Sequence, residues 1–264
     1  MELRLPKPTR LKAVRPSAAL ASKYDAKLQR AVDDMHVSLM YWIRAAYRTT
    51  GAEMAMDASP AMLLRKAMRK LTRRWQNNFD ELAPKLAAYF ATAANERVSG
   101  DMKRLLREHG FTVRFSMSRR QNEVFQAVIG EQVALIKSIA SQHLAAVEGI
   151  VMRSVQKGRA MGQLARELEE QVGVTKRRAA VIAKSQTNMS TAVLERTKQL
   201  ELGLTHAKWG HSAGGRVPRP EHVAFSGRTY EIAKGAFLEG VWTWPGVEIN
   251  CRCVSYPIIP GFDY

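Results

Sequence analysis

Apolar residues recur at three- and four-residue steps along most of the chain up to Leu202, which is the spacing of one face of an amphipathic helix. The first such helix is predicted over residues 24–48. Its apolar stripe consists of Leu28, Val32, Met35, Leu39, Trp42, Ile43 and Ala46. A second helix is predicted from Pro60, with Ser59 as its N-cap. Pro84 is expected to kink or break it, so that a third helix runs from there to His109.

Two further helical stretches follow a short change of pattern. Residues 111–115 alternate apolar and polar side chains, which predicts a short strand. Ser118 is expected to cap a long helix that ends near Gly149 or continues past it. Beyond it, helices are predicted over residues 158–172 and from Thr175 to about Leu202.

The pattern after Gly203 differs from everything before it. Residues 204–264 are rich in glycine and proline, hold three of the five tryptophans, and include β-favouring runs at residues 206–209 and 254–259. We therefore expect a mainly α protein, with an extended helical N-terminal two thirds and a small, compact, turn-rich α+β module at the C-terminus. In chain order, the predicted segments are a flexible, basic, proline-containing arm (residues 1–22), a basic helical region (23–149), and a C-terminal module (150–264) with helices over 158–202 and a β-rich part over 204–264.

The charge of the chain indicates what kind of partner it binds. The chain has 41 Lys and Arg against 24 Asp and Glu, a formal net charge of +17, and most of the excess lies in its first 120 residues. Such a field favours a polyanion, most commonly nucleic acid, although an acidic protein surface satisfies the same physics. Six basic residues gather at helical spacing after Pro60 and are called the basic ridge below: Arg65, Lys66, Arg69, Lys70, Arg73 and Arg74. This ridge is either a solvated helix face or a surface that binds phosphates or acidic groups.

A second basic element suggests sequence-specific DNA binding. Residues 158–165 and 173–179 are spaced like the two helices of a helix-turn-helix joined at Gly173. In that interpretation Lys176, Arg177 and Arg178 would contact DNA. Two helices joined at a glycine are common in any helical protein, so a purely structural role competes with this one.

Cys251 and Cys253 carry the most specific chemistry. On a strand, alternate side chains share a face, so the two sulfurs lie together. They could ligate zinc with His222, His211 or His206 completing the site, although the C-x-C spacing is unusual for zinc. Otherwise they are two buried thiols, and a disulfide between such close neighbours would be strained. We expect no cofactor, with a structural zinc ion as the only candidate.

Enzymatic activity has little support in the sequence. His222 could activate one cysteine, but nothing in the sequence orients the pair. The absence of a phosphate-binding loop and of clustered carboxylates argues against an ATPase or a two-metal nuclease. No uninterrupted apolar run approaches the ~18 to 20 residues of a membrane span, and the N-terminus lacks a signal-peptide pattern. We expect a soluble, non-enzymatic protein in a reducing compartment, without a membrane partner and without catalytic residues.

Several motifs together resemble the phage Mu F-like head morphogenesis family, the minor capsid proteins of tailed phages. The resemblance covers roughly residues 150–257. It rests on the run at residues 178–187, on the Arg-x-x-Arg-x-x-His element and Asn-Cys-Arg-Cys sequence, and on Pro245 and Gly246. The residues it marks as a structural motif are Trp209, Arg216, Arg219, His222, Gly227, Asn250, Cys251, Arg252 and Cys253. This chain departs from the family at residues 210–215 and 183–186, where the usual acidic residues are missing.

The resemblance implies a minor structural protein of the virion, located in the phage head and in the host cytoplasm during assembly. Its expected partners are the portal protein, the major capsid or scaffolding protein, and double-stranded DNA bound without sequence preference. The resemblance also implies that the protein acts at the portal vertex, in head assembly, DNA packaging or DNA delivery. The alternatives are a helix-turn-helix DNA-binding protein and a zinc- or thiol-dependent enzyme. For a head protein, the arginines, His222 and Asn250 are interpreted as a hydrogen-bonded network that fixes the C-terminal fold.

Overall fold

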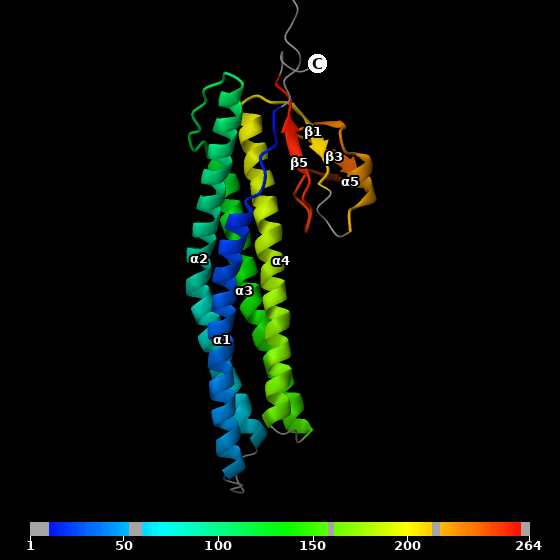
Figure 1. Ribbon diagram of the computed structural model, residues 1–264. Helices are drawn as coiled ribbons and strands as arrows, with labels where there is room; N and C mark the ends of the chain where they lie inside the picture. Colours follow the sequence, from blue (N-terminus) through cyan, green and yellow to red (C-terminus); the bar gives the residue numbers. More distant parts are fainter. Residues whose placement is uncertain (1–10, 53–59, 158–160, 213–216, 260–264) are drawn as a thin grey trace, which may run out of the picture. The chain divides into compact units, whose positions relative to one another are not determined.

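The computed structural model describes residues 11–52, 60–157, 161–212 and 217–259. Within this part of the chain four long helices precede a small region of short strands (Figure 1). The helices are α1 (Ala18–Ala52), α2 (Pro60–Glu108), α3 (Arg119–Gln156), α4 (Met161–Glu201) and the short α5 (Pro220–Ala224). The strands are β1 (His206–Gly210), β2 (Thr229–Glu231), β3 (Ala236–Leu238), β4 (Val241–Thr243) and β5 (Val254–Pro257). The predicted fold class, mainly α with a small C-terminal β module, is confirmed.

The chain folds into two compact units, and α2, α3 and α4 contribute residues to both. The first unit comprises Met1–Ser22, Tyr89–Ile129 and Lys184–Tyr264, and the second comprises Lys23–Ala88 and Gly130–Ala183. The segment boundary predicted between residues 149 and 150 falls inside α3.

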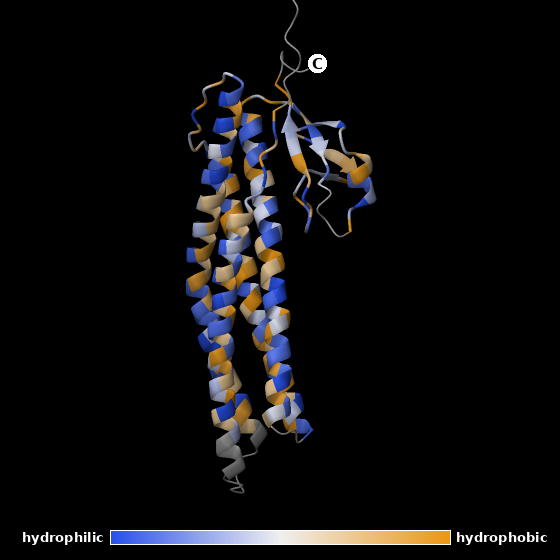
Figure 2. Ribbon diagram, in the orientation of Figure 1, coloured by the Kyte–Doolittle hydropathy of each residue, from blue (hydrophilic) through white to orange (hydrophobic). Residues whose placement is uncertain are grey.

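The second unit is a helical assembly built on the predicted apolar stripes. In α1 the stripe residues Leu28, Val32, Met35, Leu39 and Ile43 are buried. Trp42, expected on the same stripe, is instead 46% exposed. Hydrophobic and hydrophilic residues alternate along the long helices as this packing requires (Figure 2). The buried hydroxyl of Tyr24 has a hydrogen-bond partner, because it donates to Oε1 of Gln132 at 3.0 Å.

In the first unit the C-terminal module forms two small sheets. One is antiparallel with strand order β2-β1-β5, and the other is the β3-β4 hairpin. Trp209 on β1 faces Ser255 on β5 in the register, and Ala207 pairs with both Tyr230 and Pro257. The core beneath them contains Trp209, Tyr230, Ile232, Cys251 and Cys253. This arrangement places both cysteines inside the module rather than on its surface.

Local sequence signals set several helix ends. The Ser17 hydroxyl accepts the Leu20 amide at 3.2 Å at the start of α1, and Ser118 accepts that of Gln121 at 3.1 Å at the start of α3. At the end of α4, Gly203 adopts a left-handed conformation with φ of 77°. The Leu204 amide then donates to the Gln199 carbonyl at 3.0 Å, as in a Schellman cap. Ser59, the predicted N-cap of α2, lies outside the described residues.

Two predictions for this part of the chain are wrong: a separate helix after Pro84 and a strand at residues 111–115. α2 continues through Pro84, because Phe79, Ala83 and Ala87 are buried on that stretch and their packing outweighs one lost backbone hydrogen bond. Residues 111–115 form no strand, since no neighbouring strand pairs with them. Their alternation is real, however: Phe111, Val113 and Phe115 pack against the core of the C-terminal module.

The expectation of a flexible arm is also wrong for residues 11–22. Leu11 and Val14 are 2% and 3% exposed, and α1 already begins at Ala18. Leu11 belongs to the core cluster of the C-terminal module. Leu11 and Val14 therefore attach this short segment to the protein interior. The sequence did not indicate their burial, because the segment has no helical period. Residues 1–10 lie outside the described part of the chain.

Among the described helices, α3 is long and apolar enough by composition to cross a membrane. An 18-residue stretch of it has a mean hydropathy of 1.2, and 28% of that stretch is buried. The core helix of a soluble protein meets the same criteria, and Ile136, Ile139 and Leu144 of α3 are buried here.

Candidate functional site

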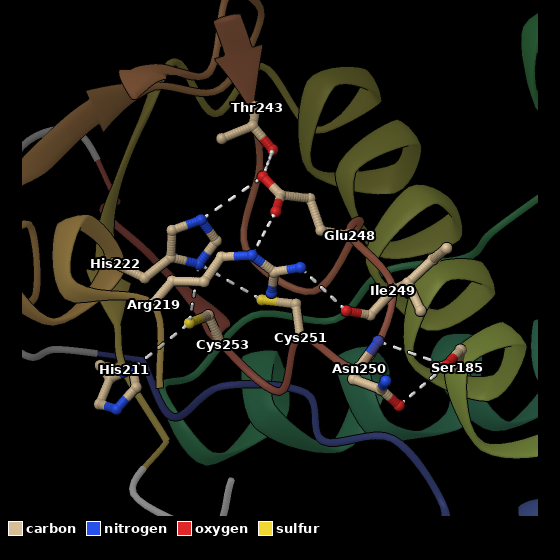
Figure 3. Close-up of polar contacts among 10 residues, drawn as sticks. All are labelled: Ser185, His211, Arg219, His222, Thr243, Glu248, Ile249, Asn250, Cys251 and Cys253. Atoms are coloured by element: carbon tan, nitrogen blue, oxygen red, sulfur yellow. Dashed lines mark hydrogen bonds and ion pairs between the residues drawn. The ribbon is translucent and has the colours of Figure 1, made fainter. Parts of the chain in front are cut away.

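The most concentrated chemistry lies where α5 meets the segment that leads into β5. α5 carries His222, and the residues before β5 carry Cys251 and Cys253, which are free thiols (Figure 3). The Nδ1 atom of His222 lies 3.6 Å from Sγ of Cys251 and 3.7 Å from Sγ of Cys253. All three side chains are buried. The structure therefore gathers three of the residues that the sequence offered as metal ligands.

His211 extends this cluster on its open side. Its Nδ1 atom lies 3.7 Å from Sγ of Cys253, and the side chain is half-buried. It follows β1 directly, so the strand fixes where it emerges. His206, the third histidine considered from the sequence, is exposed on β1 and its Nδ1 lies 3.0 Å from the hydroxyl of Thr205 instead.

The environment makes one of the two thiols acidic. The pKa of Cys251 is lowered to about 5, chiefly by its hydrogen bond with Cys253 and further by backbone groups of Cys253 and Gly246 and by the His222 ring, against the opposing effect of burial. The pKa of Cys253 is raised, chiefly by its hydrogen bond with Cys251, and further by burial and by the negative charge of a Cys251 thiolate. Ionisation of one thiol therefore disfavours ionisation of the other.

Glu248 orients His222, and sequence reasoning missed this residue. Oε1 of Glu248 lies 3.4 Å from Nε2 of His222 and accepts the Thr243 hydroxyl at 3.0 Å. Its other oxygen pairs with Nε of Arg219 at 2.9 Å. Because the carboxylate attracts the hydrogen of Nε2, a neutral ring keeps its lone pair on Nδ1, which faces the two sulfurs. The only signal in the sequence was position, an acid shortly before the Asn-Cys-Arg-Cys sequence.

Trp209 closes the inner wall of the cluster. It is fully buried, and its ring meets His222 edge to face at a centroid distance of 5.0 Å. Its indole nitrogen is buried and has no hydrogen-bond partner among the described residues.

α4 holds the cysteine segment in place. Nδ2 of Asn188 donates to the Cys251 carbonyl at 2.8 Å, and the Ser185 hydroxyl contacts both the amide and the side chain of Asn250. Asn250 takes a left-handed conformation with φ of 61°, which turns the chain just before Cys251. Ser185 belongs to the run at residues 178–187, and Asn188 follows it directly. This run on α4 is therefore hydrogen-bonded to the Asn-Cys-Arg-Cys sequence.

The remaining motif residues support the same module. Arg219 donates from Nη2 to the Ile249 carbonyl at 3.1 Å (Figure 3), and the Gly227 amide donates to the Trp209 carbonyl at 2.8 Å. Arg252 is half-buried between the cysteines. Arg216 lies outside the described residues. The contacts of Arg219, His222 and Asn250 are of the kind expected of a network that fixes this fold.

The helix-turn-helix interpretation is wrong. α4 runs without interruption from Met161 to Glu201, through both Gly173 and Thr175. Thr175 does not cap a helix; its hydroxyl donates to the Gln171 carbonyl at 3.1 Å and lies 2.8 Å from Nδ1 of His143. A glycine is tolerated in a helix whose neighbours are packed, and the turn that the motif requires is absent.

Of the three basic residues assigned to DNA contact on α4, two are engaged within the protein. Lys176 pairs with Asp33, and Nη2 of Arg178 donates to the Ser138 hydroxyl at 2.9 Å. Arg177 is exposed. All six residues of the basic ridge are exposed on α2, and none forms an ion pair with another described residue.

The arrangement of Cys251, His222 and Glu248 also has the residue types of a thiol nucleophile, its base and an orienting acid. Two features distinguish it from such a site. The same ring nitrogen serves both sulfurs at nearly equal distances, and both cysteines are at most 5% exposed. The geometry is that of donors converging on one point rather than of a nucleophile facing a substrate.

The fold and the site define a helical protein with a C-terminal module closed around a cysteine and histidine cluster. Residues 145–256 match the family described as Phage Mu protein F like protein, which confirms the predicted resemblance of this region to that family. An uncharacterised protein of Haemophilus influenzae strain Rd is 31% identical over 137 residues, which is 52% of this chain and 30% of that relative. No solved structure matches the chain.

Proposed function

We propose that this protein is a minor head protein of a tailed phage that acts in head morphogenesis at the portal vertex. The observation that carries the proposal is the match of residues 145–256 to the phage Mu F-like family, which indicates a phage head morphogenesis protein. In this role it is a non-enzymatic structural component of the virion, present in the host cytoplasm during assembly. Its partners are the portal protein and the major capsid or scaffolding protein.

The charge distribution supports contact with DNA during packaging or delivery. The basic ridge presents six exposed cationic side chains along one stretch of α2, and the whole chain carries +17. Exposed Lys and Arg side chains release counterions from DNA when they bind phosphates, which gives affinity without sequence preference. A protein that works beside a packaged genome gains from such a surface.

A co-assembly experiment tests the proposed function. The chain is co-expressed with the portal subunit and the major capsid protein of its source phage, and each protein is captured in turn at rising salt. We expect retention at fixed stoichiometry on the portal or on procapsids. Absence of the chain from both complexes, and from purified virions by mass spectrometry, would contradict the proposal.

DNA binding is measured separately with random-sequence and mixed-composition duplexes. We expect affinity that falls steeply with salt and is equal for all sequences. Tight, salt-resistant binding to one sequence would instead indicate a regulatory protein.

A further inference from the structure

The cluster of His222, Cys251 and Cys253 has the spacing of ligands around a single metal ion. The ligand atoms of these three buried residues lie within 4.8 Å of one another. A tetrahedral zinc ion with Zn–S of about 2.3 Å and Zn–N of about 2.0 Å holds sulfur and nitrogen ligands about 3.5 to 3.6 Å apart. The nitrogen–sulfur distances here are 3.6 Å and 3.7 Å. The two nitrogen–sulfur distances therefore match those between ligands of a single zinc ion.

The groups around the cluster are those that accompany a metal site. A histidine ligand usually donates a hydrogen bond from the N–H group of its other ring nitrogen, often to a carboxylate, which fixes the ring and makes it a better ligand. Nε2 of His222 has this partner in Glu248, at 3.4 Å. Glu248 is itself held by Arg219 and by Thr243 (Figure 3). The ring is therefore fixed in the orientation that leaves Nδ1 for a metal.

We propose that His222, Cys251 and Cys253 bind a structural zinc ion, with His211 as the fourth ligand. His211 lies on the open side of the cluster, with Nδ1 3.7 Å from Sγ of Cys253. The proposal requires this half-buried ring to turn toward the other three ligands, because His211 is not among the residues whose ligand atoms all lie within 4.8 Å of one another. Two thiols lose their protons to the solvent when zinc binds, and two neutral imidazoles complete the set. The resulting site carries no net charge, which suits a buried position.

Zinc at this position would join parts of the module that are distant in sequence. His211 follows β1, His222 belongs to α5, and the cysteines lead into β5. The strands of this module have three to five residues each. Metal binding free energy contributes to folding in small domains of this kind. The site is structural because all four positions are filled by protein side chains, with none left for a substrate.

The first test is the metal content of the full-length protein, purified under reducing conditions without a metal-affinity tag. We expect one zinc ion per chain by plasma mass spectrometry. Exchange for cobalt(II) should give intense visible absorption and a thiolate-to-cobalt charge-transfer band, which report tetrahedral thiolate coordination directly. Both thiols should react slowly with a thiol reagent while zinc is bound and rapidly after chelation.

Variants separate a ligand role from a packing role. Cys251→Ser and His222→Gln should abolish stoichiometric zinc, whereas His211→Gln should weaken zinc binding at least about tenfold and keep the fold. His206→Gln is the matched control, because His206 lies on β1 outside the cluster, and it should retain zinc fully. Circular dichroism of each variant with and without zinc identifies any that fail to fold.

Metal-free protein that takes up neither zinc nor cobalt, with thiols whose reactivity chelators do not change, would overturn the proposal. If His211→Gln binds zinc as tightly as the parent protein, His211 is not the fourth ligand, and the proposal stands for His222, Cys251 and Cys253 only. These outcomes do not depend on whether the protein assembles into a phage head, so the zinc site and the proposed function are tested independently.

Discussion

The Nε2 atom of His222 lies 3.4 Å from Oε1 of Glu248. This contact connects the cysteine cluster to the rest of the C-terminal module, because the same carboxylate also binds Arg219 and Thr243. One acidic side chain thereby fixes a histidine on α5, an arginine that precedes α5 and a threonine on β4.

Replacement of Glu248 should therefore loosen the site without removing any candidate ligand. Glu248→Gln keeps the shape of the side chain but loses the charge that attracts His222 and Arg219. We expect zinc binding to weaken about 10- to 100-fold and the free energy of unfolding to fall by about 1 to 3 kcal/mol. Competition with a chromophoric chelator and urea titration measure the two effects. Glu231→Gln, which removes a surface pair with Lys234, is the control and should change neither.

A side chain at Gly246 should destabilise the protein. Its φ is +82°, and a Cβ there would lie 3.1 Å from the Cys253 carbonyl oxygen and 3.2 Å from Cβ of Ala192. Gly240 has nearly the same φ, +81°, but a Cβ added there would meet no other atom within 4 Å. Gly240→Ala should cost only the backbone strain, about 1 kcal/mol, while Gly246→Ala should cost roughly 2 to 4 kcal/mol. Equal losses in thermal unfolding would show that the contacts with Cys253 and Ala192 do not matter.

His143 should make the protein sensitive to mild acid. Burial, with a smaller effect of His36, lowers the pKa of His143 from 6.5 to about 4. The folded state therefore binds fewer protons than the unfolded state, so this contribution to stability is complete above pH 6.5 and is lost as pH falls toward 4. The loss reaches at most about 3 kcal/mol.

His143→Asn preserves a polar partner for Thr175 and cannot titrate in this range. Its free energy of unfolding, measured in urea from pH 7.5 to pH 4.5, should decline less than that of the parent protein. His206→Gln serves as the comparison, because His206 is exposed on β1. A parallel decline in the parent and in His143→Asn would assign the acid sensitivity to other groups.

The basic ridge should supply much of the DNA affinity. The triple variant R65Q/R69Q/R73Q removes three exposed charges, and we expect the slope of log K against log salt to fall by up to about 3. The matched triple variant K23Q/R30Q/R166Q removes three exposed charges from α1 and α4. It changes the net charge equally and should affect the slope less. Equal effects of the two triples would indicate that net charge alone, and not the ridge, determines binding.

Long-range features of the site could be predicted only in part. The sequence brought Cys251, Cys253 and His222 together as candidates because their residue types suit a soft metal. It did not identify Glu248, since a lone carboxylate in a loop has no periodicity or spacing that marks it. It also misassigned Lys176 and Arg178, whose partners Asp33 and Ser138 lie on other helices.

The sequence by itself determined the helical character of most of the chain, the buried stripe of α1, the cap at Ser118, and the family resemblance of its C-terminal region. These features depend on side chains close together along the chain, through helical periodicity, local hydrogen bonds or short motifs. Tertiary structure alone decided that α2 passes through Pro84, that α4 passes through Gly173, and that Leu11 and Val14 are anchored. In each case burial of side chains against distant segments outweighs a local preference of about 1 to 3 kcal/mol.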